Sequence, residues 1–436
     1  MSRNTDFPRL LLVTISPLLG RSTGTDVTIS SLLSAWPGDR IAQVFIGTQS
    51  EADGTHGQVL AISPRNAVFE FDIRRLVNRS GSLQGSKAPV NAGVPVRGYR
   101  NPRTRAHMAM RFIADASPVR MPREVRRQAR EFAPDVVYSL LGTLRMIGLS
   151  QSLANDLGVP VVPHFMDDWV HTLYTSGELW GIAQEVTRHR LLRLMQAAPI
   201  GMSISRPMAE EYSRLFGIPF SSVANSAGEE FFAIPRKDPS EMLVIMYMGG
   251  LHVGRAEALA GVADALGRCA TKANAAQIIV HCPHEDVGRY GSTLRNRSNV
   301  TLAGTLSLGE VPTALGEADI LLHVESSDPG DVAFTRLSVS TKIPQYLAAG
   351  RPVLCFAPSQ LASSNLIMES GGGLVVSNGM ALDGAVSSLL SDATLRNEIA
   401  ARGRTFARAN LSRSVVLERF VRALQIAAGS AKRRAS

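Results

Sequence analysis

Short apolar runs alternate with helical patterns along most of the chain. Within the helical segments, apolar residues recur at spacings of three and four, as on the buried face of a helix. Strands that alternate with crossover helices predict parallel sheets covered on both faces. The predicted strands are Leu10–Ser16, Ile41–Ile46, Asp135–Ser139, Pro160–His164, Ile200–Ile204, Leu243–Met248, Ile278–Cys282, Val300–Ala303, Ile320–Val324 and Val353–Phe356. The predicted helices between them include Asp26–Trp36, Leu149–Leu157, Leu179–Ala197, Arg206–Phe216 and Ala256–Leu266.

This alternation starts twice, which predicts an α/β protein with two Rossmann-like, doubly wound domains and a cleft between them. The join lies in Phe232–Ser240, where prolines and charges interrupt the pattern. The predicted domains are therefore residues 1–235 and 236–411. Residues 412–436 form an amphipathic helix that leans back across the join, with apolar positions at Val416, Phe420 and Leu424. The basic end of the chain, Ala431–Ser436, is predicted to be disordered.

Composition narrows the class of protein. The 436 residues are 45% hydrophobic and 19% charged, which is typical of globular domains. No apolar run approaches the ~18–20 residues that span a bilayer, and we interpret the apolar run Arg9–Ile15 as a first buried strand. Three widely spaced cysteines give no disulfide framework or zinc pattern, which favours a cytoplasmic location. The net charge of +9 favours an anionic partner.

The segment Ser338–Cys355 has the most informative chemistry. It predicts a helix of barely two turns, with Pro344 in its first turn, that ends at Gly350 and precedes a buried strand. Free N–H groups at a helix start attract phosphate, and Lys342 adds a full charge there, with Gln345 on the same face. Such a site suits the diphosphate of a nucleotide-sugar. Three residues are candidate N-caps of this helix: Ser338, Ser340 and Thr341.

A second cationic region lies between Arg97 and Arg130. It contains ten arginines but only two acidic residues, Asp115 and Glu124. Four of the arginines follow the spacing of one helix face: Arg123, Arg126, Arg127 and Arg130. Apolar residues that we expect to be exposed lie just upstream: Met108, Met110, Phe112 and Ile113. A basic face beside exposed apolar residues predicts docking onto an anionic membrane surface, although a solvated helix face is the alternative. No recognised fold or aromatic set favours nucleic acid as the partner.

Several motifs occur in an order that is itself informative. In the second half these are Met246–Leu251 with Arg255, Asn299–Gly304, Ala318–Leu322, Ser338–Val353 and Glu369–Val376. In the first half they are Pro134–Tyr138, Gly158–Val162 and Val223–Asn225. Taken together, the chain resembles the GT-B glycosyltransferases, particularly the family-4-like enzymes of polysaccharide and glycolipid assembly. The resemblance is strong from about residue 243 to 376 and loose before 130.

The resemblance implies a donor site in the second half. Its residues are Gly249, Gly250, Arg255, Gly304, Ser340, Thr341, Lys342 and Gln345. Arg255 and Lys342 are expected to stabilise the charge of the leaving diphosphate without a metal ion or cofactor. Many relatives have glutamate where this chain has Gln345, and some have a second glutamate at the position of Leu337. Glu325, after the preceding strand, is a candidate substitute for the missing sugar contact.

The resemblance also implies an acceptor side in the first half. Asp167 and Asp168 follow a predicted strand at its carboxyl end, where relatives often have a histidine–aspartate pair; either is a candidate general base. Capping of the next helix is the alternative for Asp168, and the adjacent pair does not have the Asp-x-Asp spacing of a metal site. The other acceptor-side candidates are Gly20, Arg21 and Asn225.

The sequence therefore predicts a glycosyltransferase that moves a sugar from a nucleotide-sugar to a saccharide or lipid-linked acceptor, in the cytoplasm or on the cytoplasmic face of the membrane. Two alternatives stay open. One is a sugar-nucleotide epimerase or hydrolase on the same fold, which would turn over donor without an acceptor. The other is a non-catalytic two-lobed protein that binds a sugar or nucleotide.

Overall fold

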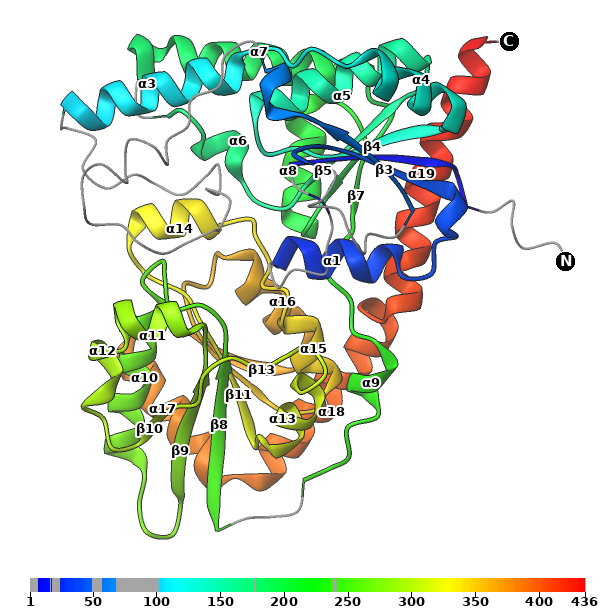
Figure 1. The fold of residues 1–436 in the computed structure, drawn as a ribbon. Helices are drawn as coiled ribbons and strands as arrows, with labels where there is room; N and C mark the ends of the chain where they lie inside the picture. The colour runs from blue at the N-terminus through cyan, green and yellow to red at the C-terminus, as the bar shows by residue number, and fades with distance from the viewer. Residues whose placement is uncertain are drawn as a thin grey trace, which may run out of the picture. The chain divides into compact units, whose positions relative to one another are not determined.

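The computed structural model describes residues 7–15, 17, 24–48, 57–67, 102–175, 178–237 and 241–435. The chain divides into two compact units, which are described separately (Figure 1). Unit 1 contains residues 1–223 together with 417–436, and unit 2 contains residues 224–416. Among the described residues, no helix combines the length and apolarity needed to cross a membrane.

Unit 1 is built on a seven-stranded parallel sheet of order β3-β2-β1-β4-β5-β6-β7. The strands are β1 (Leu10–Thr14), β2 (Ile41–Ile46), β3 (Gln58–Ile62), β4 (Val136–Leu140), β5 (Val161–Phe165), β6 (Gly201–Ser203) and β7 (Phe220–Ser222). Its α-helices are α1 (Gly24–Leu33), α3 (Pro102–Ala116), α4 (Arg123–Phe132), α5 (Leu144–Leu157), α6 (Trp169–Thr172), α7 (Ile182–Ala197) and α8 (Arg206–Phe216). Short 3₁₀ helices are η1 (Gly38–Arg40), η3 (Pro64–Asn66) and η5 (Glu178–Gly181).

Unit 2 is built on a six-stranded parallel sheet of order β10-β9-β8-β11-β12-β13. The strands are β8 (Met242–Met248), β9 (Ala275–His281), β10 (Val300–Leu302), β11 (Ile320–Val324), β12 (Val353–Phe356) and β13 (Gly373–Val376). The helices are α9 (Glu229–Phe232), α10 (Arg255–Cys269), α11 (His284–Tyr290), α12 (Ser292–Arg295), α13 (Val311–Glu317), α14 (Pro329–Thr335), α15 (Ile343–Ala348), α16 (Ala362–Ser370), α17 (Gly379–Ser391) and α18 (Ala393–Asn410). The last helix, α19 (Arg413–Ala435), begins in unit 2 and continues into unit 1.

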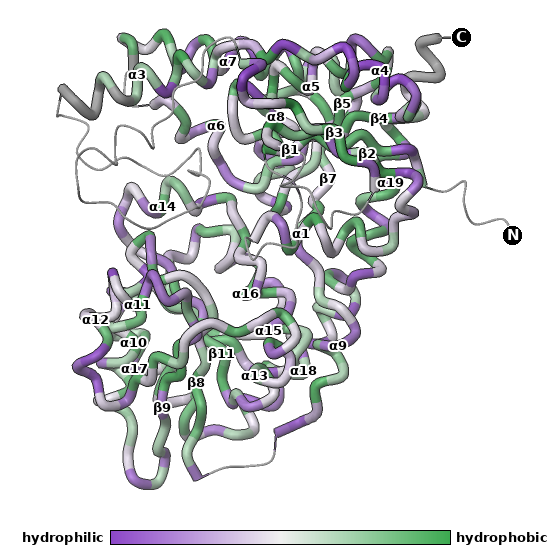
Figure 2. Tube along the Cα trace, viewed as in Figure 1, coloured by the Kyte–Doolittle hydropathy of each residue, from purple (hydrophilic) through white to green (hydrophobic). Residues whose placement is uncertain are grey.

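The central strands are buried on both faces, which is why they are mainly apolar rather than alternating. All five residues of β1 are buried, as are those of β4 except Leu140 and all of β11 (Figure 2). Helix boundaries follow local chemistry: the Thr143 hydroxyl accepts the Met146 N–H to cap α5, and Gly158 ends that helix with a left-handed φ of 68°.

Helix α19 completes the core of unit 1. Phe420 is fully buried, and its ring meets Trp36 and Tyr138 edge-to-face at centroid distances of 5.6 and 5.3 Å. These distances are typical of favourable aromatic pairs. The predicted amphipathic helix is therefore present, and Phe420 lies on its buried side.

The predicted fold class, two parallel sheets of Rossmann type, is confirmed, and every predicted strand has a counterpart. Three strands were missed: β3, β7 and β13, which lie at or near sheet edges and are only partly buried. The prediction that the chain end is disordered is wrong for residues 431–435, because α19 continues to Ala435.

Candidate functional site

Lys342 precedes α15 in unit 2 and is the centre of the predicted donor site. Its side chain is partly exposed, and it has no hydrogen-bond or ion-pair partner among the residues that the structure describes. Burial, followed by repulsion from Arg255, lowers the pKa of Lys342 to about 8. Glu325 offsets part of this repulsion, but no carboxylate among the described residues pairs directly with the amine, and such a setting favours an anion.

Arg255, the first residue of α10, is held by a carboxylate from the neighbouring strand. Its Nε and Nη2 donate to the two oxygens of Glu325, each at 3.0 Å, and Glu325 is only 5% exposed. Such a bidentate pair fixes both the position and the plane of the guanidinium group. Sequence reasoning named both residues but not their pairing.

His323 lies below this pair on β11. It is buried, its Nε2 lies 3.6 Å from a Glu325 oxygen, and burial lowers its pKa to about 4. The imidazole is therefore neutral at pH 7. Because Glu325 neutralises Arg255, the group Arg255, Glu325 and Lys342 carries one net positive charge, and that charge is on the unpaired amine.

The turn after β8 brings backbone close to Lys342. Gly249 has a φ of 152°, and a Cβ placed there would lie 3.1 Å from the Tyr247 hydroxyl and 3.5 Å from Lys342 Nζ. A Cβ at Gly250 would collide with the His252 ring at 2.5 Å. The absence of side chains at this turn leaves the backbone approachable beside the cation.

Contacts from other elements hold this turn and the segment before α15. Tyr247 donates its hydroxyl to Gly250 O at 2.7 Å, and Asp286 accepts the Leu251 N–H at 2.7 Å. The Tyr346 hydroxyl accepts the Met248 N–H at 3.1 Å, which joins α15 to the end of β8. The sequence pattern did not predict the pairings of Asp286 and Tyr346, because each joins the turn to a distant element, α11 or α15.

Asn225 also helps to hold the segment before α15. It is 2% exposed and donates its amide N–H to Thr341 O at 2.5 Å. Its own Oδ1 is buried with no partner among the described residues. Asn225 was named as an acceptor-side candidate; its contact lies within unit 2, beside the Lys342 segment.

The predicted N-caps of the short helix are wrong. The helix begins at Ile343, Lys342 occupies the N-cap position, and no side chain caps it. The Ser340 N–H is instead bonded to the Ser363 hydroxyl, and the Ile343 N–H to Ser340 O. With Pro344 in its first turn, the helix offers fewer free N–H groups than the sequence predicted, so the charge of Lys342 matters more.

The structure also describes Gln345, Gly304 and Leu337, which were named from the sequence in connection with the donor site. Gln345 is partly exposed on α15, and no side-chain partner is found for it in the described part of the chain. Gly304 follows β10 with a φ of 78°, and its carbonyl accepts the Cys282 N–H and faces His281 Nδ1. Leu337 is 4% exposed, so it belongs to the core.

Asp167 and Asp168 follow β5 in unit 1 but differ in their surroundings. Asp168 is fully buried; its Oδ1 accepts the Tyr212 hydroxyl at 2.8 Å and lies 2.6 Å from His171 Nδ1. It stands at the N-cap position of α6 but makes no side-chain capping bond. Asp168 therefore holds Tyr212 and His171, whereas Asp167 is partly exposed.

His164, at the end of β5, is a buried histidine with a partner at each ring nitrogen. Its Nδ1 lies 2.6 Å from the Tyr138 hydroxyl and its Nε2 lies 3.1 Å from Val223 O. Burial lowers its pKa to about 3, so it is neutral at pH 7. Gly20 and Arg21, the other acceptor-side candidates, lie outside the described residues.

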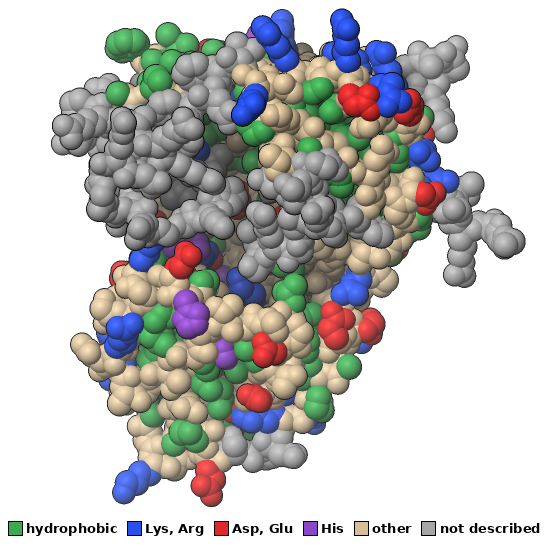
Figure 3. Space-filling view, viewed as in Figure 1, with side chains coloured by type: hydrophobic (Ala, Val, Ile, Leu, Met, Phe, Trp, Pro, Cys, Tyr) green, Lys and Arg blue, Asp and Glu red, His purple; other side chains and the backbone are tan. Residues whose placement is uncertain are grey.

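The predicted arginine face of α4 is present, with Val125, Ala129 and Phe132 buried on the other side. Lys and Arg side chains gather over this edge of unit 1 (Figure 3). Arg123, Arg126, Arg127 and Arg130 line a hollow of about 450 Å³ together with Glu131.

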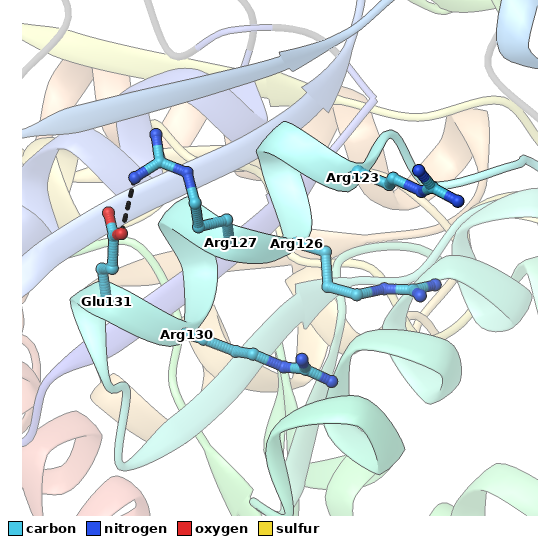
Figure 4. Close-up of a pocket in the computed structure, with 5 residues that line it drawn as sticks. All are labelled: Arg123, Arg126, Arg127, Arg130 and Glu131. Carbon is cyan, nitrogen blue, oxygen red and sulfur yellow. Dashed lines mark hydrogen bonds and ion pairs between the residues drawn. The ribbon is translucent and has the colours of Figure 1, made fainter.

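Acidic neighbours neutralise part of this face. Arg127 turns to Glu131 at 2.6 Å and also pairs with Glu124, while the other three arginines extend in a common direction (Figure 4). Arg126 pairs with Asp156 at 2.9 Å. The predicted exposure of Met108 and Phe112 is wrong, because they are 8% and 6% exposed; Ile113 is exposed at 43%.

No protein-family model matches this sequence, and no curated protein sequence matches it either. Solved structures do share its fold. The chain is similar to Anabaena Alr3699/HepE in complex with UDP, with 13% identity, 96% of this chain and 99% of that chain covered, and a TM-score of 0.63. It is also similar to WaaG, a glycosyltransferase involved in lipopolysaccharide biosynthesis, with 11% identity, 96% of this chain and 100% of that chain covered, and a TM-score of 0.57. For sucrose-phosphate synthase from Thermosynechococcus elongatus the identity is 11%, the coverage is 95% of this chain and 97% of that chain, and the TM-score is 0.58.

These likenesses extend over nearly the full length of each chain. They show that this protein has the GT-B fold, the two-domain Rossmann-like architecture of glycosyltransferases. At such low identity they establish the fold, and the chemistry is argued from the site itself.

Proposed function

We propose that this protein transfers a glycosyl group from a nucleotide-sugar to a saccharide or lipid-linked acceptor. The observation that carries the proposal is the partly buried, unpaired amine of Lys342 beside a turn without side chains. Alr3699/HepE, which has the same fold, is known in complex with UDP and with UDP-glucose. If a diphosphate binds at Lys342, this protein and Alr3699/HepE bind the same class of ligand.

The proposed reaction breaks the bond between the anomeric carbon of the sugar and the phosphate oxygen. The bonding electrons leave with the nucleoside diphosphate, so negative charge grows on it in the transition state. Lys342 and the guanidinium of Arg255, oriented by Glu325, stabilise that charge, and each charge-assisted hydrogen bond contributes roughly 1.5–3 kcal/mol. In this proposal no metal ion is required for departure of the leaving group.

For the acceptor we propose Asp167 as the general base. The acceptor hydroxyl oxygen forms the new bond to the anomeric carbon, and its proton passes to a carboxylate. Asp167 is partly exposed directly after β5, so an acceptor can reach it, whereas Asp168 is fully buried. Asp168 then acts as a positioning residue.

We further propose that unit 1 docks on an anionic membrane surface through the face of α4, in the cytoplasm. Arg123 and Arg130 are exposed without an ion-pair partner among the described residues, and Arg126 points the same way. Neutralisation of Arg127 by two glutamates leaves a weaker attraction than four free arginines would give.

A non-catalytic nucleotide-binding protein is the alternative that a specific observation favours. Leu337 is a core residue where some relatives have a sugar-binding glutamate, and Gln345 replaces a carboxylate. Such a protein would bind nucleoside diphosphate at Lys342 without turning over any sugar donor. A sugar-nucleotide epimerase or hydrolase would turn over the donor with no acceptor present.

A thermal-shift screen of UDP, GDP, ADP, CDP and their sugars tests the proposal. One ligand at one hundred times its Kd should add about 2.7 kcal/mol to the free energy of unfolding. Lys342→Ala should remove that stabilisation, while the control Lys272→Ala, at an exposed position of unit 2, should retain it. Equal stabilisation of both variants would exclude Lys342 from the site, and absence of any stabilising ligand would overturn the function.

A further inference from the structure

Trp180 is the most exposed large aromatic residue in the described part of unit 1. It lies in η5, directly before α7, and 88% of its surface is accessible. Leu179 and Trp180 both have left-handed backbone angles, with φ of 50° and 58°. Non-glycine residues rarely adopt this conformation, and two in succession mark a turn whose shape is held at a cost.

The turn presents a small apolar surface. Ile182, at the start of α7, is 56% exposed, and Ile113, on α3, is 43% exposed. The turn packs against both α3 and α7. We call Trp180, Ile182 and Ile113 the apolar tip. Hydrophobic side chains gather at this end of unit 1 over α3 and the start of α7 (Figure 3).

The helices that continue from the apolar tip are strongly basic. Figure 1 shows α3, α7, α5 and α4 along the same face of the seven-stranded sheet. Together α3, α4 and α7 contain ten arginines and four acidic residues, a net charge of +6 within a total of +9. Arg193 on α7 is exposed like Arg123 and Arg130, without an ion-pair partner among the described residues.

We propose that the apolar tip inserts into the headgroup region of an anionic lipid bilayer while Arg111 of α3 and the arginines of α4 and α7 contact the phosphates. Tryptophan suits this depth, because its ring is apolar and its indole N–H bonds to the polar interface. A basic helix surface next to an inserted aromatic residue combines an electrostatic and an apolar contribution. The inference rests on the proposed anionic-surface docking of α4 and is independent of sugar transfer.

Tryptophan fluorescence tests insertion directly. The chain contains three tryptophans, and Trp36 and Trp169 are 2% and 3% exposed. Vesicles of phosphatidylglycerol and phosphatidylcholine should therefore shift the emission of Trp180 to shorter wavelength and protect it from a water-soluble quencher. Unchanged emission and quenching at vesicle concentrations that sediment the protein would overturn insertion.

Co-sedimentation with the same vesicles separates the two contributions. Trp180→Ala should weaken binding about tenfold or more, as expected for loss of one buried aromatic side chain, also in 0.5 M salt. The double variant Arg123→Ala/Arg130→Ala should bind more weakly than the wild type at low salt. In 0.5 M salt, which screens the electrostatic contribution, the two should bind nearly equally. Met380→Ala, at a 91% exposed apolar position of unit 2, is the matched control and should bind like the wild type.

Trp180→Phe should retain most binding while losing the fluorescence change, and circular dichroism should show that each variant is folded. Binding of Trp180→Ala equal to that of the wild type would overturn the inference. So would a wild-type dimer in the absence of lipid that Trp180→Ala converts to monomer, because the apolar tip would then be a contact between two copies. Vesicle binding that only the arginine variant loses would leave the docking of α4 standing and exclude insertion of the tip.

Discussion

At the scale of single residues, the proposed donor site depends on the amine of Lys342, for which no partner is found among the described residues. Glu325 is shared bidentately with Arg255, so it offsets one cation and leaves the charge of Lys342 for a ligand. The three groups are hydrogen-bonding or electrostatic neighbours although they lie on α10, β11 and the segment before α15. This arrangement makes binding sensitive to the protonation of one side chain.

The lowered pKa of Lys342, about 8, predicts a pH dependence for diphosphate binding. A diphosphate prefers the protonated amine, so affinity should fall by up to tenfold per pH unit above about 8, with proton uptake on binding near that pH. Calorimetry at pH 7, 8 and 9 measures both effects. Lys342→Arg keeps its charge and should give a flat profile; a flat profile in the wild type would contradict the assignment.

The lowered pKa of Lys342 affects the free energy of unfolding in the opposite direction. The folded protein releases the Lys342 proton near pH 8, whereas the unfolded chain retains it to about 10.5. The unfolded state therefore binds more protons between these values, and the contribution of Lys342 to the free energy of unfolding rises with pH in that window. Binding and stability thus respond to pH in opposite directions.

At the scale of elements, Tyr346 joins α15 to the end of β8: its hydroxyl accepts the Met248 N–H at 3.1 Å and donates to Met248 O at 3.5 Å. Tyr346→Phe would leave the buried Met248 N–H without its partner, which costs about 1–3 kcal/mol. Chemical unfolding should show that loss. Tyr290→Phe is the control, since no partner of its hydroxyl is found among the described residues, and it should change stability by less than about 0.5 kcal/mol. Equal stability of the two variants would mean that this link does not support the site.

Elements with a clear period were predictable from the sequence, and those defined by tertiary contacts were not. The apolar run of β11 and the helix α8 were predicted with their observed bounds. β3 was missed because its residues alternate between buried and exposed at a sheet edge, next to a segment of weak pattern. The wrong N-caps before α15 have a similar cause, since the hydroxyl that serves Ser340 comes from Ser363 on α16.

In the candidate site, too, some residues were predictable from motifs, whereas their tertiary partners were not. Lys342 and Arg255 could be named from motifs, but the carboxylate that holds Arg255 lies 70 residues away, directly after β11. The hydrogen bond between Asp168 and Tyr212 likewise joins residues that are 44 positions apart in the sequence. Single-sequence patterns give the period of each element and not the register between elements, so partners across a sheet stay undetermined.

At the scale of the whole molecule, unit 1 depends on the last segment of the chain. Phe420→Ala should destabilise unit 1 by about 3–5 kcal/mol, because it empties a site between Trp36 and Tyr138. Denaturant unfolding followed by tryptophan fluorescence measures this, as every tryptophan of the chain lies in unit 1. The exposed position Ile426, also on α19, provides the control Ile426→Ala, which should have little effect. An unchanged midpoint for Phe420→Ala would show that α19 is dispensable.

The division of α19 between the units also sets an order for biosynthesis. When a ribosome has added residue 416, all of unit 2 has been made, although it began after most of unit 1. Unit 1 must wait, with the surface that receives Phe420 uncovered, until the part of α19 that contains this residue emerges. The half of the protein that is translated first is thus the half that is finished last.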